Sequence, residues 1–151
     1  MASIKLEAAS IATLASTELN SLAAGSGALG AEYDNATNLY IWGLLELAVD
    51  FASAPAAGGL VDVYLIPAPD GTNYVDNTTG ASEYAPSTTY LGAFPIQATA
   101  NAQRISLGLG GPVKVELPPT KFKIFVINNT NQAFPASGST IKMVPTRLQS
   151  A

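Results

Sequence analysis

The stretch Lys121-Phe122-Lys123-Ile124-Phe125-Val126-Ile127 decides the fold class of this chain. It begins as an alternation of charged and apolar residues and ends as a continuous apolar run. Alternation indicates a strand with one buried face, and an uninterrupted apolar run is typical of a central strand covered on both faces. The stretch therefore predicts a central β-strand, and the polar residues 128–131 predict the turn that follows it.

Similar strand patterns recur on both sides of this stretch, separated by Gly, Pro and Asn. They cover residues 4–8, 38–51, 60–66, 89–97, 103–107, 113–117 and 139–144. Short strands with a turn signal every 8–12 residues are the signature of an antiparallel sandwich or barrel. We expect an all-β fold, an antiparallel β-sandwich of about eight strands that is jelly-roll-like. An immunoglobulin-like strand order offers the same alternation and stays open.

Three local signals refine this picture. Leu, Glu and Ala between residues 16 and 24, followed by Gly25, predict one short N-terminal helix. Pro95 favours an edge strand or a bulge for its segment, and Gly43 indicates a bulge or a close backbone approach. We expect a single domain over residues 1–151, with residues 1–12 as a candidate N-terminal arm and residues 68–88 as a long surface loop.

The composition excludes several classes of chemistry. The 151 residues include no His and no Cys, and only seven basic and eleven acidic residues, whereas 48% are hydrophobic. Without these two residue types there is no imidazole base, no thiolate nucleophile, no Ser-His-Asp triad and no ordinary zinc site. Glu46 and Asp50 would lie about 13 Å apart on a strand, too far for a catalytic pair. We predict no catalytic, cofactor-binding or metal-binding residue.

The charges bear on partners. Residues 1–83 hold ten acidic and one basic residue, whereas residues 84–151 hold six basic and one acidic residue. Either the two halves interleave and their charges mix, or the molecule has two faces of opposite sign. The few basic residues are dispersed, so no nucleic acid partner is expected. The longest apolar stretch, residues 39–49, is too short to span a bilayer, and we expect neither a secretory signal nor a membrane contact.

Four residues are candidate interface or glycan contacts: Asp70, Tyr74, Tyr84 and Tyr90. Asp70-Gly71-Thr72-Asn73 lacks the ligand spacing of a calcium loop and is interpreted as a β-turn. Exposed tyrosines among Asn, Asp and Thr are suited to stacking on sugar rings, and equally suited to the rim of a subunit contact. Both uses stay open at this point.

Three longer stretches resemble small virion structural proteins of tailed bacteriophages. They are TLASTELNSL (residues 13–22), VDVYLIPAPDGTNY (residues 61–74) and LPPTKFKIFVINN (residues 117–129). Within that group the chain is most similar to capsid cement (decoration) proteins. The resemblance implies a β-sandwich or jelly roll on the outer capsid surface, a homotrimer, and the major capsid protein as partner. It implies no catalytic residue. A carbohydrate-binding module, or a tail or fibre component, is the alternative.

Overall fold

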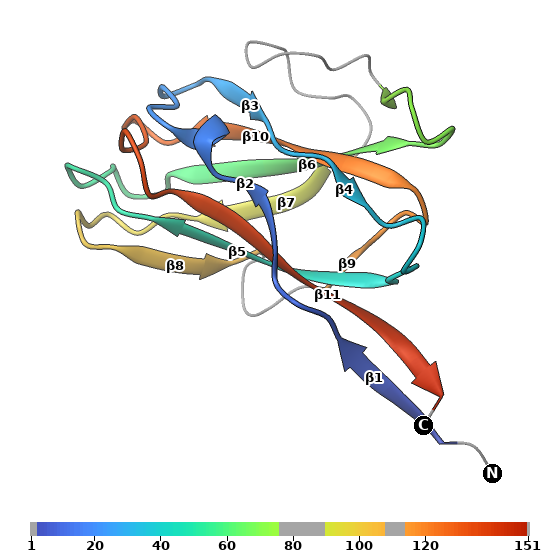
Figure 1. Ribbon diagram of the computed structural model, residues 1–151. Helices are drawn as coiled ribbons and strands as arrows, with labels where there is room; N and C mark the ends of the chain where they lie inside the picture. Colours follow the sequence, from blue (N-terminus) through green and yellow to red (C-terminus); the bar gives the residue numbers. More distant parts are fainter. Residues whose placement is uncertain (1–2, 76–89, 108–113, 151) are drawn as a thin grey trace.

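The computed structural model describes residues 3–75, 90–107 and 114–150, which form two antiparallel β-sheets facing each other (Figure 1). The first sheet contains β1 (Ile4–Ala8), β2 (Ala12–Ala15), β5 (Trp42–Val49), β8 (Gln103–Ser106), β9 (Lys114–Glu116) and β11 (Thr140–Ser150). The second contains β3 (Gly27–Leu29), β4 (Tyr33–Asp34), β6 (Leu60–Ala68), β7 (Tyr90–Pro95) and β10 (Lys121–Asn129). The expected all-β antiparallel sandwich is confirmed.

The strand order follows a simple rule. The first sheet runs β1–β11–β5–β8, with β2 also beside β11 and β9 also beside β5; the second runs β3–β10–β6–β7, with β4 also beside β10. Three positions are thus shared by two short strands each, β1 with β2, β3 with β4 and β8 with β9. With each such pair counted as one, the chain has eight strand positions. The first (β1/β2) pairs with the eighth (β11), and the second (β3/β4) pairs with the seventh (β10). The third (β5) pairs with the sixth (β8/β9), and the fourth (β6) pairs with the fifth (β7). The chain is one long antiparallel hairpin rolled into two layers.

The core lies between the two sheets and is built by alternate residues. Leu45, Leu47 and Val49 of β5 point inward and are buried, as Ile141 and Met143 of β11 are. From the second sheet, β10 supplies Phe122, Ile124 and Val126. Each fully buried side chain of this size contributes roughly 1.5–3 kcal/mol relative to an exposed one. The prediction that residues 121–127 form a central strand is confirmed, because β10 lies between β6 and the β3/β4 position.

Two of the local signals are also confirmed. β7, which contains Pro95, is the end strand of its sheet, and its ladder with β6 shifts register between Val63 and Tyr64. Gly43 is a site of close approach, because a Cβ atom there would lie 2.6 Å from the Met143 sulfur. A side chain at position 43 would force the core residue to move.

The predicted N-terminal helix is not what the structure has. Residues 16–24 contain a single 3-10 turn, η1 (Thr17–Leu19), and Ser21 adopts a positive φ of 55°. The backbone of this segment bonds elsewhere: the Ser21 amide donates to the Pro135 carbonyl, and the Phe134 amide donates to the Leu22 carbonyl. Hydrogen bonds to a distant segment therefore replace the helical ladder.

The strand count also differs from the expected eight, because eleven strands occur in the described residues. β2, β3 and β4 were not expected; they span two to four residues each, too few for a periodic pattern to show. β11 is longer than expected and continues through Pro145 to Ser150. Of the expected loop over residues 68–88, residues 69–75 form a turn region, and residues 76–89 lie outside the described residues.

One feature departs from a compact sandwich. β1 pairs with residues 146–150 at the end of β11, and the two leave the body together as a two-stranded projection, at the lower right of Figure 1. We call residues 4–8 and 146–150 the ribbon. The expected N-terminal arm thus contains a strand paired to the far end of the sequence.

Candidate functional site

The outward face of the first sheet carries exposed apolar side chains where polar ones are usual. On β5 and β11 the inward residues form the core, so the alternate residues face outward. Leu44 and Val144 are directly opposite each other on this face, and Ile11, which precedes β2, lies beside them. Ile11 is 66% exposed and Leu44 is 38% exposed. Apolar residues on an outward sheet face mark a contact surface.

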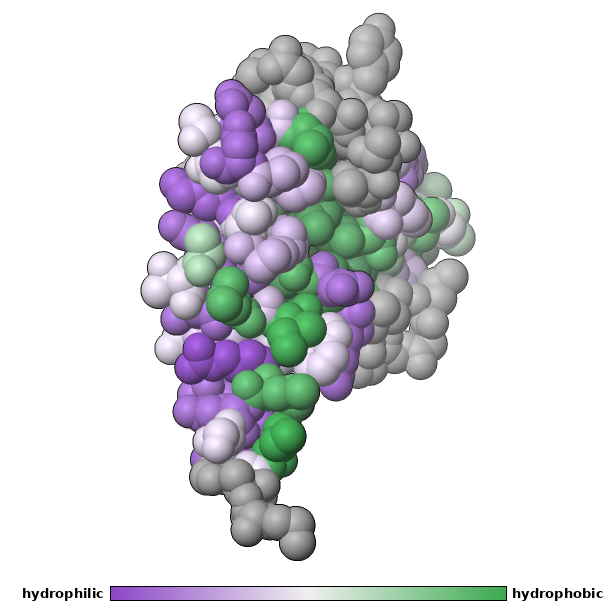
Figure 2. Space-filling model, turned by 90° about the vertical axis from the view of Figure 1, so that its right-hand side faces the viewer, coloured by the Kyte–Doolittle hydropathy of each residue, from purple (hydrophilic) through white to green (hydrophobic). Residues whose placement is uncertain are grey.

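The ribbon continues this surface away from the body. Ile4, Leu6 and Leu148 have the same outward orientation, and they are 73%, 52% and 52% exposed. Figure 2 shows hydrophobic side chains along one side of the projecting ribbon and hydrophilic ones along the other. We define the strip as six exposed or half-buried aliphatic residues of this face: Ile4, Leu6, Ile11, Leu44, Val144 and Leu148.

The other face of the ribbon is charged and fixes its orientation. Glu7 and Arg147 form an ion pair of 2.7 Å across the two strands. Arg147 also donates to the Asn38 carbonyl at 3.1 Å, and its guanidinium lies 5.3 Å from the centre of the Tyr40 ring. These contacts attach the ribbon to the segment between β4 and β5, so the apolar side of the ribbon remains turned away.

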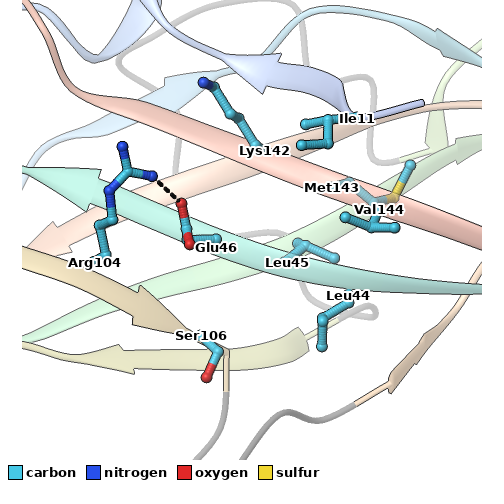
Figure 3. Close-up of a pocket in the computed structure, with 9 residues that line it drawn as sticks. All are labelled: Ile11, Leu44, Leu45, Glu46, Arg104, Ser106, Lys142, Met143 and Val144. Carbon is cyan, nitrogen blue, oxygen red and sulfur yellow. Dashed lines mark hydrogen bonds and ion pairs between the residues drawn. The ribbon is translucent and has the colours of Figure 1, made fainter. Parts of the chain in front are cut away.

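A shallow pocket of about 270 Å³ opens on the strip (Figure 3). Leu44, Val144 and Ile11 contribute apolar lining, and polar groups stand at one side of it. There Arg104 donates to Glu46 at 2.7 Å, and Lys142 lies nearby. Because both partners of this ion pair are largely exposed, it contributes little to stability. An apolar floor with a few polar groups at its side suits a protruding apolar side chain.

The ion pairs join the acidic first half of the sequence to the basic second half. Each of the three ion pairs found among the described residues joins an acidic residue of the first half to a basic residue of the second: Glu46–Arg104, Glu32–Lys121 and Glu7–Arg147. The rolled strand order brings the two halves side by side. The interpretation that the halves interleave and mix their charges therefore describes these residues.

Asp70 organises a turn. One of its carboxylate oxygens accepts hydrogen bonds from the amides of Thr72 and Asn73 at 2.9 and 2.7 Å, and the other accepts from the Asn73 side chain. The Asn73 amide and side chain, followed by the Thr72 amide, lower the pKa of Asp70 to about 2. Gly71 supplies the positive φ of 79° that the turn requires. The carboxylate is thus engaged by its own loop, as the β-turn interpretation anticipates.

Tyr74 is held on both its ring and its hydroxyl. The hydroxyl donates to Glu32, the Lys123 ammonium lies 4.5 Å from the ring centre, and Lys121 pairs with Glu32 at 3.0 Å. Partial burial, together with the bond to Glu32, raises the pKa of Tyr74 to about 12, and the same bond lowers the pKa of Glu32. One face of the ring is therefore occupied by Lys123.

Tyr90 lies at the start of β7, on the outward face of the second sheet. It is 57% exposed, its ring centre is 5.3 Å from that of Tyr64, and its hydroxyl donates to Asp62 at 3.0 Å. Burial against these neighbours raises the pKa of Tyr90. Tyr84, the fourth predicted contact residue, lies outside the described residues. Asp70, Tyr74 and Tyr90 belong to two separate clusters, and both of these lie away from the strip.

The sequence indicated only part of the strip. Residues 1–12, the candidate N-terminal arm, contain Ile4, Leu6 and Ile11, whereas Leu44, Val144 and Leu148 were not expected at a contact surface. The alternation Ile4-Lys5-Leu6-Glu7-Ala8 shows one apolar face of this strand but not which way that face turns. Within the described ranges, no group of three or more acidic side chains is gathered as a metal site would require. Nor does that part of the chain contain a helix that is long and apolar enough to cross a membrane.

Comparison with known proteins assigns no family. No protein-family model matches the chain, and no curated protein matches it. A solved structure titled Turnip yellow mosaic virus is similar with 15% sequence identity and a TM-score of 0.37, over 100% of this chain and 82% of that one. Another, titled CBM4 structure and function, has 12% identity and a TM-score of 0.28, over 85% of this chain and 80% of that one.

Proposed function

We propose that this chain is a non-enzymatic structural protein of a phage virion, a capsid cement protein that binds at the junctions of capsid subunits. The observation that carries the proposal is the strip, a row of exposed apolar side chains extending from the body of the sandwich to the ribbon. Such a surface costs little to desolvate and gains free energy when a partner covers it. A protein that binds only the assembled shell stabilises the shell by linkage.

The strand order supports the same proposal. The strand positions pair first with eighth, second with seventh, third with sixth and fourth with fifth. This is the order of a jelly roll, a fold that capsid domains often use. Fold alone does not define function. It does supply a rigid body of two packed sheets, on which the strip is held in a fixed shape.

Copy number in the particle tests the proposal. Quantitative mass spectrometry of purified virions is expected to find the chain at a number comparable to that of the major capsid protein. If the chain is present at about six or twelve copies, the symmetry of a tail or portal, the cement role is overturned. The same holds if the chain is absent from the virion.

A matched pair of substitutions tests the surface. Leu44 and Leu60 are 38% and 37% exposed on the outward faces of opposite sheets. We expect Leu44→Glu to weaken co-sedimentation of the chain with capsids by at least tenfold, because the new carboxylate and Lys114, which lies opposite residue 44, would both have to be desolvated in the contact. Leu60→Glu introduces the same charge away from the strip and should leave attachment unchanged. Equal effects of the two substitutions would contradict the assigned surface.

One observation favours a second candidate, a carbohydrate-binding module. The exposed ring of Tyr90 lies beside Tyr64 and the polar groups of Asp62 and Asn129, a combination of aromatic and hydrogen-bonding groups that suits a sugar. Affinity electrophoresis in a panel of polysaccharides tests it. Retardation that is lost in Tyr90→Ala and kept in Leu44→Glu would favour this candidate over the cement role.

A further inference from the structure

The outer edge of β1 is an unpaired strand edge at the far side of the ribbon. Among the described residues β1 forms ladder hydrogen bonds with β11 alone, and four of its five residues are exposed. An unpaired edge is a template for another strand, and natural proteins usually protect it with bulges, prolines or charged side chains. β1 contains no proline, and its ladder with β11 shows no shift of register. Its two charged residues, Lys5 and Glu7, have opposite signs and can therefore pair with those of another β1.

The register shows which backbone groups face that edge. The Ala9 amide donates to the Pro145 carbonyl at 2.9 Å, which makes this a hydrogen-bonded position of the ladder. Bonded and non-bonded pairs alternate in an antiparallel ladder, so Lys5 and Glu7 also bond to β11. The amides and carbonyls of Ile4, Leu6 and Ala8 therefore point away from β11, toward the free edge.

We propose that β1 pairs antiparallel with β1 of a second copy of this chain, about a two-fold axis that passes beside Leu6. In this register each Leu6 exchanges both backbone hydrogen bonds with the other Leu6. Lys5 of each copy lies opposite Glu7 of the other, and Ile4 lies opposite Ala8. The first sheets of the two molecules then form one continuous sheet.

Charge selects this register over its neighbours. Residues that lie opposite each other in a ladder have their side chains on the same face of the sheet. A two-fold axis perpendicular to the sheet leaves each side chain on the face it already occupies. The axis must therefore pass beside one residue that lies opposite its own copy. Centring on Lys5 or on Glu7 would place two like charges directly opposite each other, which is unfavourable. When the axis passes beside Leu6, Lys5 of the other copy lies next to Glu7, which already pairs with Arg147. The three side chains then form a row of alternating charge.

The opposite face of the joined ribbons becomes continuous as well. Leu148 lies opposite Leu6 within one ribbon, so the pairing produces a row of four leucines across the axis. A two-stranded ribbon alone is at best marginally stable in water, whereas three or more strands with an apolar face can be stable. The four strands of the joined ribbons are therefore more stable than either ribbon alone. The pairing also joins the two strips into one larger surface, although the inference does not depend on what that surface binds.

Light scattering after size exclusion, on the full chain without capsids, tests the pairing. We expect a mass of twice 15.5 kDa that falls toward one chain on dilution. Lys5→Glu places like charges opposite each other at two symmetric positions and should raise the dimer dissociation constant by at least tenfold. Lys114→Glu makes the same change on β9 and should leave the dissociation constant unchanged. A monomer at all concentrations, a trimer, or equal effects of the two substitutions would overturn the proposal.

A charge swap gives a result that loss of folding cannot imitate. Lys5→Glu and Glu7→Lys chains each repel their own copies, but a mixed pair restores opposite charges at every position. We expect native mass spectrometry of the mixture to show the mixed dimer and little of either self-pair. Hydrogen exchange adds the register, since the Leu6 amide should exchange slowly only in the dimer. A Leu6 amide that exchanges equally fast in monomer and dimer would overturn the assigned edge. Because no capsid is present, failure here leaves the cement role to its own test.

Discussion

At the scale of single residues, two buried asparagines hold the loops that close the sandwich. The Asn35 side chain donates to the carbonyls of Tyr40 and Pro118 and accepts from the Tyr40 amide. The Asn128 side chain donates to the carbonyls of Leu22 and Gln132 and accepts from the amide and hydroxyl of Thr130. Both side chains are buried and satisfied, so they fix loop geometry that apolar residues could not specify.

Replacement of Asn128 by Ala should destabilise the protein strongly. The substitution removes four hydrogen bonds and leaves the Thr130 amide without an acceptor, whereas the Leu22 and Gln132 carbonyls each keep one donor, the Phe134 amide and the Thr130 hydroxyl. A buried unsatisfied amide costs about 1–3 kcal/mol, and the cavity left by the side chain adds to this cost. We expect a loss of about 2 kcal/mol or more in urea unfolding. Asn129→Ala, at the exposed neighbouring position, serves as the control and should change stability by less than about 1 kcal/mol. Equal losses would show that the hydrogen bonds of Asn128 are not responsible.

Asp70 predicts a pH dependence at the acid end. Its pKa of about 2 in the folded protein lies below the ordinary value of 3.8, because amides of its own turn bond to the carboxylate. Its contribution to stability is therefore complete above pH 3.8 and is lost as the pH falls toward 2. NMR titration of the carboxyl group should give the lowered pKa, and Asp70→Asn should flatten the decline of stability in this range. A midpoint near 3.8 would contradict the turn geometry.

At the scale of elements, the long strands were predictable and the short ones were not. β5, β6 and β10 have eight or nine residues with clear periodicity, so their side chains alone define a strand. β2, β3 and β4 are short and are defined by their partners β10 and β11, which sequence periodicity cannot reveal. The 3-10 turn η1 replaced the expected helix for the same reason, since distant carbonyls and amides bond its surroundings.

The strip was predictable only in part. The alternation of residues 4–8 does show that one face of β1 is apolar. Whether that face turns toward the core or away from it depends on which residue of β11 lies opposite Leu6. Leu148 and Arg147 point to opposite sides of β11, so a shift of one residue in the register would reverse the two faces of β1. This register is set by residues about 140 positions away. The sequence therefore pointed to Tyr74 and Tyr90 as contact residues and did not show that Leu6 faces outward.

The attachment of the ribbon to the body should depend on Arg147. Arg147→Ala removes the ion pair with Glu7 and the contacts with Asn38 and Tyr40. We expect faster hydrogen exchange in residues 4–8 and 146–150, with a loss of less than about 1 kcal/mol in global stability, because both side chains of the ion pair keep contact with solvent and the ribbon lies outside the core. Arg104→Ala, which removes an ion pair of equal length on the body, is the control. Unchanged exchange in the ribbon would mean that the strands alone set its orientation.

At the scale of the whole molecule, the missing histidines and cysteines are consistent with a protein whose role is packing. Its core is a sandwich of aliphatic and aromatic side chains between two sheets, and the ion pairs found among the described residues lie outside that core. The sequence indicated this class of architecture through alternation. The rolled strand order required the pairings themselves, since jelly-roll and immunoglobulin-like sandwiches share the same alternation.

The ribbon also has a consequence for the order in which the protein is built. Glu7 and Arg147 are 140 residues apart, and β1 has no ladder partner in the described chain other than β11. A ribosome delivers the first strand long before the last, and contacts of such high sequence separation form late and slowly. β1 must therefore wait, unpaired, until synthesis reaches β11. The ribbon, which carries part of the surface that we assign to assembly, is then among the last parts of the molecule to form.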